Sequence, residues 1–242
     1  DFSDGKEFAG RLAFQPFKNN DIAALQGVGF GAGGSYSQVN SNTAGLPNTT
    51  GGTLPGYVTS ALQQFFAYNP AVGTVYADGA HWRVSPYGNY TKGPFGLLGE
   101  YIISRQGVVN SATSVRANLV DSAWQASVQW VLTGEDASFT GITPKSPFDP
   151  RAGKWGAWQL VARFAQADLD SDAFPVFSDP TLSAPSAMSW GIGLNWWLNK
   201  NVRVLTSYSK TWFEGGGDVN PAISRSLVPP ATVTHQDENV FM

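Results

Sequence analysis

The clearest alternation of apolar and polar positions runs from Met188 to Phe213. In its first half every second residue is apolar, from Met188 to Leu198, and most residues between them are Gly, Ser or Asn. A polar turn at Asn199–Asn201 follows, and the alternation then resumes. A period of two residues predicts β-strands whose two faces have different surroundings. The stretch therefore predicts a hairpin of two strands, each long enough to cross a bilayer when tilted.

The two faces of this hairpin differ in a way that indicates its environment. A soluble hairpin of this length would bury its apolar face against a second layer. Here the apolar face ends in aromatic residues, and the opposite face carries Gly, Ser, Asn and Arg. Apolar side chains facing lipid and polar side chains facing water are typical of a transmembrane β-barrel.

The same alternation recurs along the chain and predicts an all-β fold of about nine antiparallel strands. We expect them at 7–17, 25–36, 80–90, 95–105, 115–132, 155–167, 188–199, 202–213 and 237–242. Short turns are expected at Lys18–Asp21, Thr91–Pro94 and Asn199–Asn201, all on the periplasmic side. The alternation is lost around Asn118 and Asp121, where we expect a bulge.

Four longer connections separate these strands, at 39–78, 133–154, 168–187 and 214–236. The first is rich in Gly, Asn, Thr and Pro, and a short helix is expected within it at Thr59–Tyr68. Connections of this length inside a compact domain are usually functional. In a barrel this segment would lie on the outer side of the membrane or fold into the lumen.

A glycine-rich segment, GFGAGG at 29–34, matches the dinucleotide-binding pattern G-x-G-x-x-G. That motif requires an amphipathic helix directly after it. Here glycines continue at every second position and no such helix follows. The pattern favours a strand whose glycines line an inner wall that something approaches closely.

Composition narrows the possible functions of the 242 residues. Mean hydropathy is -0.16, and no run of about 18 apolar residues provides a transmembrane helix. The absence of Cys excludes disulfides and thiolate metal sites. A net charge of -3 does not support a globally basic nucleic-acid binder. Asp168, Asp170, Asp172 and Asp179 lack the ordered spacing of a calcium loop, so no metal or other cofactor is expected.

Four longer segments resemble the phosphate-selective porins of the O and P type. They are YGNYTKGPFGLLGEY (87–101), WQASVQWVLTGE (124–135), PKSPFDPRAGKWGAWQLVARFAQADLD (144–170) and WGIGLNWWLNKNVRVLTSYSKTWF (190–213). The resemblance implies a trimer of 16-stranded barrels in the bacterial outer membrane. It further implies contact with lipid and a constricted lumen carrying arginines and lysines. The chain is most similar to the C-terminal part of the family, so we expect residues 1–242 to be one barrel domain, incomplete at both ends.

The polar face of the predicted strands carries an arginine on each of four strands. They are Arg11, Arg83, Arg163 and Arg203. Rows of cationic side chains favour anions in a pore, so these four are the candidate pathway, with phosphate as the permeant that the resemblance implies. The alternative is that they are ordinary lumen arginines, paired with Glu7 and Glu100, in a general porin for small hydrophilic solutes.

Two further classes of protein remain open. A barrel enzyme would need a catalytic group at its rim, for which His235 and the serines offer little, so no enzymatic activity is expected. A soluble β-sandwich binding module would pack its Trp-rich faces against each other. Aromatic residues near predicted strand ends instead favour the belts found at membrane interfaces. These residues are Tyr90, Trp124, Trp155, Trp158, Trp196 and Trp212.

Overall fold

One antiparallel sheet of nine strands forms most of the chain. The computed structural model describes residues 6–40, 54, 56–60, 62–68, 75–214 and 238–241. The strands of the sheet lie side by side in the order in which they occur along the chain. In order they are β1 (Glu7–Phe14), β2 (Val28–Asn40), β5 (Val75–Lys92), β6 (Phe95–Asn110), β7 (Arg116–Val131), β8 (Ala157–Asp168), β9 (Ser186–Trp197), β10 (Arg203–Glu214) and β11 (Glu238–Phe241). The predicted all-β antiparallel fold and its nine strands are confirmed.

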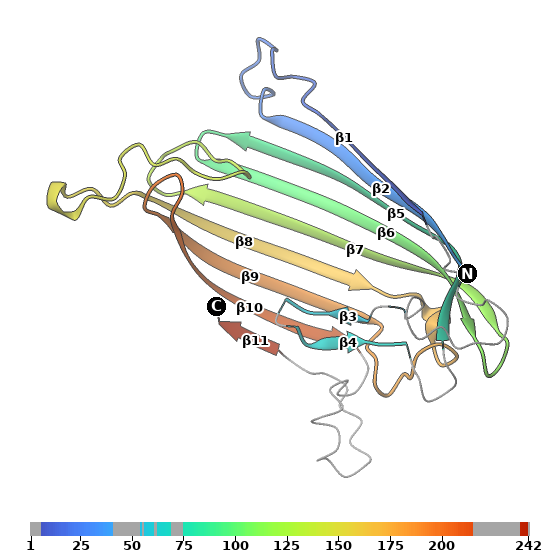
Figure 1. Cartoon of the computed structure of the whole chain (residues 1–242). Helices are drawn as coiled ribbons and strands as arrows, with labels where there is room; N and C mark the ends of the chain where they lie inside the picture. Colours follow the sequence, from blue (N-terminus) through green and yellow to red (C-terminus); the bar gives the residue numbers. More distant parts are fainter. Residues whose placement is uncertain are drawn as a thin grey trace.

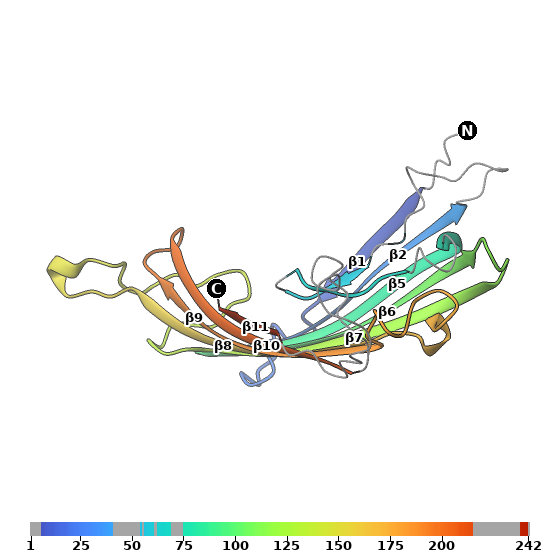
Figure 2. The ribbon, with the colours of Figure 1, turned by 90° about the horizontal axis from the view of Figure 1, so that it is seen from below.

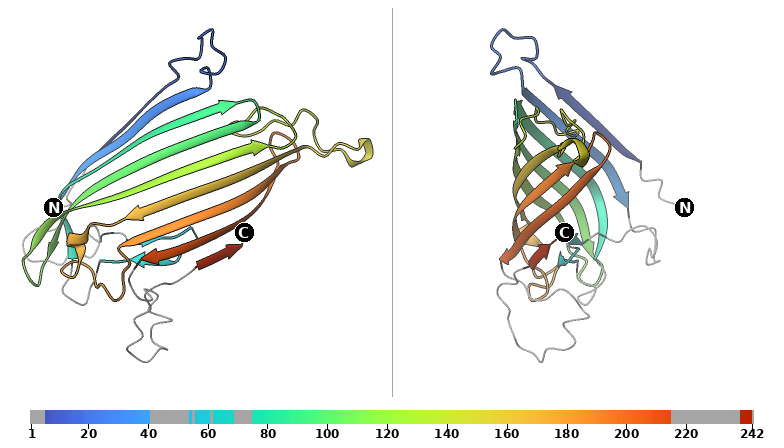
Figure 3. Two further views of the ribbon diagram at one scale, coloured as in Figure 1. Left: turned by 180° about the vertical axis from the view of Figure 1, so that it is seen from behind. Right: turned by 90° about the vertical axis from the view of Figure 1, so that its left-hand side faces the viewer.

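The sheet is curved into a trough. Figure 1 shows the long strands side by side, and Figure 2 shows both flanks of the sheet rising from its centre. The end-on view in Figure 3 shows the same curvature. Among the described residues, β1 pairs only with β2 and β11 only with β10, so these strands form the two edges of an open sheet.

A small hairpin lies on the concave side of the trough, as Figure 2 shows. It consists of β3 (Tyr57–Val58) and β4 (Gln64–Phe66), which pair antiparallel. The predicted helix at Thr59–Tyr68 is therefore wrong. Phe65 and Phe66 are 7% and 1% exposed because they pack into an apolar cluster against the sheet. Tertiary packing thus overrides the local sequence pattern.

The predicted bulge near Asn118 and Asp121 is also wrong. The β6–β7 register runs without a shift from Phe95↔Trp130 to Val109↔Arg116. The alternation is lost in the sequence because Leu119 faces the same apolar cluster and is 1% exposed. The irregularity lies instead in β5, where the pairing with β6 shifts between Ala77 and His81.

The two faces of the sheet follow the predicted alternation. Residues directly opposite each other in an antiparallel pair lie on the same face. Trp190, Ile192 and Leu194 are 37%, 43% and 37% exposed, and they alternate with residues of the concave face. Asn195 and Arg203 line a cavity on that concave face. The predicted facing of these five residues is confirmed, whereas contact of the apolar ones with lipid stays a prediction.

Short turns join β5 to β6 and β9 to β10, as predicted. In the second turn, the Asn199 side chain accepts hydrogen bonds from the Asn201 amide at 2.8 Å and the Val202 amide at 3.0 Å. The β1–β2 connection spans residues 15–27 and is longer than the predicted turn at Lys18–Asp21. Because strand directions alternate, these connections share one end of the sheet with the segment 132–156, which contains the short helix η1 (Pro150–Ala152). The side of the membrane remains a prediction.

The opposite end carries the connection 169–185, with the short helix η2 (Ser171–Ala173). Much of 39–78 and nearly all of 214–236, including His235, lie outside the described residues. Within the described ranges, no helix has the length and apolar character needed to cross a membrane. Of the six aromatic residues predicted near strand ends, Trp124 lies in the middle of β7 instead.

Candidate functional site

All four candidate arginines lie on the concave face. The register links them through directly opposed residues across the sheet. Arg163 lines a cleft together with the β3–β4 hairpin, and Arg203 lines a second cavity. All four side chains are exposed. The sequence pattern thus predicted their shared face, although their role in anion passage stays a prediction.

Arg83 and Arg11 have close partners on neighbouring strands. Arg83 donates to Glu7 at 2.8 Å and to Ser35 at 3.3 Å. The Arg11 guanidinium lies 4.8 Å from the centroid of the Tyr87 ring. The expected pairing with Glu7 is confirmed. Glu100 instead accepts hydrogen bonds from Ser85 and from Gln125, the latter at 2.6 Å.

The glycine row of β2 makes room for side chains of the neighbouring strand. A Cβ atom at Gly31 would lie 2.4 Å from the Tyr87 ring, and one at Gly29 would lie 2.7 Å from the Asn89 side chain. The missing side chains let Tyr87 lie flat across the wall beneath Arg11. The close approach predicted for this wall is therefore made by side chains of β5.

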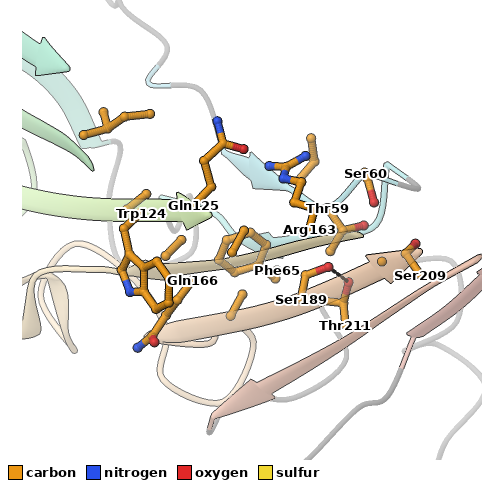
Figure 4. Close-up of a pocket in the computed structure, with 17 residues that line it drawn as sticks. Thr59, Ser60, Phe65, Trp124, Gln125, Arg163, Gln166, Ser189, Ser209 and Thr211 are labelled. Carbon is orange, nitrogen blue, oxygen red and sulfur yellow. Dashed lines mark hydrogen bonds between the residues drawn. The ribbon is translucent and has the colours of Figure 1, made fainter. Parts of the chain in front are cut away.

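Arg163 occupies a cleft of about 270 Å³ between the sheet and the hairpin. Figure 4 shows its side chain extending towards Thr59 and Ser60, which belong to the hairpin turn. In the described part of the chain, Arg163 forms no ion pair and no side-chain hydrogen bond. Its guanidinium is thus a cation whose hydrogen-bond donors are available to a ligand.

A row of three residues forms the floor beside this arginine. Arg163 on β8 lies opposite Gly191 on β9, which lies opposite Ser209 on β10. Gly191 leaves the space between the other two side chains open. The buried Ser209 Oγ finds no hydrogen-bond partner among the described residues. Next to this row, the Thr211 and Ser189 hydroxyls are 3.2 Å apart, so the cleft combines one cation with several hydroxyls.

The hairpin that covers the cleft is held to the sheet by polar and apolar contacts. The Tyr57 hydroxyl donates to Asp121 Oδ2 at 2.6 Å. Burial, followed by the charge of Asp121, raises the pKa of Tyr57, so its hydroxyl stays a donor. Phe65 stacks on Phe213 with ring centroids 5.7 Å apart, and the Ala184 amide donates to the Phe65 carbonyl at 2.8 Å. The hairpin is thus anchored to the sheet through both of its strands.

The second cavity, of about 290 Å³, contains Arg203. It lies between the sheet and residues 138–141 of the 132–156 segment. Arg203 lies 5.1 Å from the centroid of the Trp197 ring. Glu135 stabilises the covering segment by accepting hydrogen bonds from Thr133 and from the Lys145 amide. Burial would raise the pKa of Glu135, but these hydrogen bonds and the Lys145 charge lower it below its usual range.

Three of the four acidic residues of the 168–187 segment have structural partners. Asp168 accepts from Ser186 at 2.8 Å, and Asp170 accepts from the Val120 amide at 2.7 Å. Asp179 accepts from the Thr181 amide at 2.8 Å. These carboxylates cap turns and tie this segment to β7 and β9.

The alternation in the sequence placed Gly191 and Ser209 on the polar face but gave them no role in a site. Sequence reasoning missed the hairpin residues Thr59 and Ser60 altogether. The residues that cover Arg163 carried no signal, because the hairpin lies about a hundred residues earlier and reaches the cleft only through tertiary packing.

Comparison with known proteins identifies a family. Residues 1–212 match the family model of the phosphate-selective porins O and P. No curated protein sequence matches the chain. The family match covers the four candidate arginines and ends at Trp212, two residues before the end of β10.

Proposed function

Because the chain belongs to the phosphate-selective porin O and P family, we propose that it conducts anions passively along its arginine-bearing concave face. Phosphate is the leading permeant, as the family implies. Guanidinium groups stay charged at any working pH and bind phosphate oxygens in a fork. Conduction requires that each site release its anion to the next, and several spaced arginines suit this better than one tight pocket.

Family membership establishes where the protein is located and which general class it belongs to. The protein is an outer-membrane porin and is not an enzyme. Porins are β-barrels, so the curved sheet is part of a barrel wall, although the nine described strands do not close.

The observation that carries the proposal is that Arg163 forms no ion pair in the described part of the chain. Arg83 forms an ion pair with Glu7, so part of its electric field is neutralised. Arg163 has no such partner among the described residues and lies in a cleft roofed by Thr59 and Ser60. In a narrow lumen its field would be screened less than on an open surface. Arg163 should therefore attract anions more strongly than Arg83.

Three finer points belong to the same proposal. The exposed apolar side chains of the convex face would contact lipid or a neighbouring subunit. The functional unit would be a homotrimer, which crosslinking of the folded protein in membranes can test. Residues 1–242 would be one barrel domain that further strands complete.

The test replaces Arg83 and Arg163 by Ala together in the complete barrel. We expect the anion-over-cation permeability ratio, measured from reversal potentials at low salt, to fall. Arg163→Ala alone should account for most of that fall, because Arg83 is already paired with Glu7.

Arg151→Ala is the matched control. Arg151 is exposed in η1, away from the concave face, so its loss removes the same charge and should leave selectivity unchanged. An unchanged permeability ratio in a folded double variant would show that these arginines are only lumen wall. The general-porin alternative would then hold.

A further inference from the structure

The convex face of the sheet carries an arginine at the border of its apolar part. Starting at the turn to β5, the convex positions of β6 are, in order, Phe95, Leu97, Gly99, Tyr101, Ile103 and Arg105. The run is thus apolar until Arg105 introduces a charge. Within the described ranges, Arg105 forms no ion pair and no side-chain hydrogen bond. Its guanidinium donors are therefore available to a molecule outside the chain.

The length of this run matches the thickness of the apolar part of a membrane. At its beginning, Phe95 stacks on Trp130 with ring centroids 5.8 Å apart, an arrangement that suits the aromatic belt at one interface. The strand from Phe95 to Arg105 spans roughly 33 Å. With the tilt of barrel strands, such a segment rises about 25 Å, which is the height of the apolar band of outer-membrane barrels. Arg105 therefore falls at the opposite interface, at the level of the lipid headgroups.

Aromatic side chains accompany Arg105 at this level. The register places Trp82 of β5 directly opposite Arg105, and Tyr36 of β2 directly opposite Trp82. On its other side, Arg105 lies opposite Val120 of β7. Tyr36 and Val120 are 49% and 43% exposed, so this row faces outward. Because Trp and Tyr are enriched at membrane interfaces, the two rings support the depth that the strand length gives for Arg105.

A second arginine of the convex face has a partner within the chain. Arg116, nearer the end of β7, forms an ion pair with Asp78, and its side chain is 66% exposed. Arg105 is less exposed and has no carboxylate beside it among the described residues. A charge next to the apolar part of a membrane is costly unless it reaches a polar partner at the interface. The environment of Arg105 thus calls for an anion that the chain itself does not supply.

We propose that Arg105 binds the phosphate of an acidic lipid headgroup, with Trp82 and Tyr36 beside the lipid. A guanidinium matches the geometry of phosphate oxygens and binds them in a fork. Headgroup phosphates lie at this depth on the same side of the wall as the apolar band. An acidic headgroup keeps the charge of its phosphate, whereas a zwitterionic headgroup carries its own cation. The site should therefore prefer acidic lipids to zwitterionic ones.

The lipid site is independent of the conduction pathway. Arg105 lies on the convex face, whereas Arg163 lines a cleft on the concave face. The inference rests on the proposed function in one respect, since the convex face must contact lipid here and not a neighbouring subunit. It does not require that the channel conduct anions, so the two can fail separately.

The experiment measures which lipid lies next to Arg105. Residues 1–242 contain no Cys, so Val120→Cys introduces one reactive thiol into them for a bimane label. The complete barrel, with any other Cys replaced, is refolded into vesicles of equal parts phosphatidylglycerol and phosphatidylcholine. One lipid carries brominated acyl chains, which quench nearby fluorophores, and the two lipids then exchange this role. We expect phosphatidylglycerol to be enriched about fivefold beside the label, because one basic residue near acidic lipid contributes about 1 kcal/mol.

Two arginine variants decide whether this preference belongs to Arg105. Arg105→Ala should make the quenching by the two lipids equal. Arg116→Ala is the matched control, because Asp78 already neutralises Arg116 on the same face, and it should keep the preference. A label introduced by Ile192→Cys, on the convex face of β9, should report the average lipid composition of the vesicle. Inorganic phosphate in the buffer should leave the preference unchanged, because the bound group belongs to a lipid.

Several outcomes would overturn the inference. Equal quenching by the two lipids while both arginines are present would do so without any further variant, even if Arg105→Ala failed to fold. An equal loss of preference in both arginine variants would show general attraction and no site. Loss of the preference in inorganic phosphate would mean that Arg105 binds the free anion. Absence of quenching by either lipid would mean that a subunit covers this face. Reversal potentials of the same samples test anion conduction separately.

Discussion

At the scale of single residues, the arginines of the concave face differ in their contacts, since Arg83 donates to Glu7 whereas Arg11 lies over the Tyr87 ring. Parity alone placed Arg11, Arg83, Arg163 and Arg203 together, because each strand continues the alternation of its neighbour. The alternation of apolar and polar residues could not reveal which side chains the arginines contact. The contact of Arg11 with Tyr87 depends on the register of three strands and on the empty space above Gly31, and none of these is written in the local sequence.

Gly107 offers a sharp test at this scale. The irregular pairing of β5 brings the Asp78 carbonyl oxygen to 2.3 Å from where a Cβ at Gly107 would lie. Because that atom belongs to the backbone, it cannot swing away. Gly107→Ala should lower the free energy of unfolding by about 1–3 kcal/mol, as overpacking generally does.

The measurement is urea unfolding of the complete barrel in lipid. Gly99→Ala provides the comparison on the same strand, because the nearest atom to its added Cβ would be 4.0 Å away. Equal stability of the two variants would mean that β5 does not approach β6 this closely.

At the scale of elements, the long strands could be predicted and the hairpin could not. Each strand carries its signal in its own alternation. The β3–β4 hairpin is too short for such a pattern, and its conformation depends on the cluster that Phe65 and Phe66 enter. Leu119 belongs to that cluster, which is why β7 loses its alternation at the end that the hairpin covers.

The polar contact that anchors the hairpin, between Tyr57 and Asp121, depends on a single hydroxyl group. Tyr57→Phe deletes the hydroxyl that donates to Asp121, leaving a carboxylate that is 9% exposed with one partner fewer. A hydrogen bond to a charged group contributes about 1.5–3 kcal/mol. We expect the hairpin to leave the cleft more often, which should appear as greater current noise in single channels.

Tyr36→Phe is the matched control for this prediction. The Tyr36 hydroxyl is exposed and donates to Gln38 at 3.3 Å on the same strand. Its loss should leave the current noise unchanged. If the current noise of the Tyr57→Phe channel were also unchanged, the apolar cluster alone would hold the hairpin in place.

The convex face gives a second prediction for an element. Leu194 lies in the middle of β9 and is 37% exposed there. Leu194→Arg should destabilise the barrel by about 2–4 kcal/mol if the residue lies near the middle of the membrane. Leu182→Arg places the same change on an exposed leucine of the 169–185 connection, which is 42% exposed. Unfolding in lipid should separate the two variants, and similar stabilities would argue against a lipid-facing β9.

At the scale of the whole molecule, the strand order followed from the sequence, whereas the covering segments did not. When neighbouring strands are antiparallel and follow each other along the chain, their order can be predicted from the strands and the connections between them. The hairpin and residues 138–141 bring distant parts of the chain onto the concave face. The sequence thus predicted the wall and its cations, and only the structure reveals the two enclosed sites.

The edges of the sheet carry the last prediction. Among the described residues, β1 and β11 each have one neighbouring strand, and all eight residues of β1 are exposed. Backbone groups without partners cost several kcal/mol each in the hydrocarbon core, so membranes admit closed barrels and not open edges. We therefore expect the polypeptide of residues 1–242 alone to give no discrete conductance steps in planar bilayers. The complete barrel, refolded in the same detergent, should give them. Steady, uniform steps from residues 1–242 alone would mean that these strands close without further partners, and the proposal of one larger barrel would be lost.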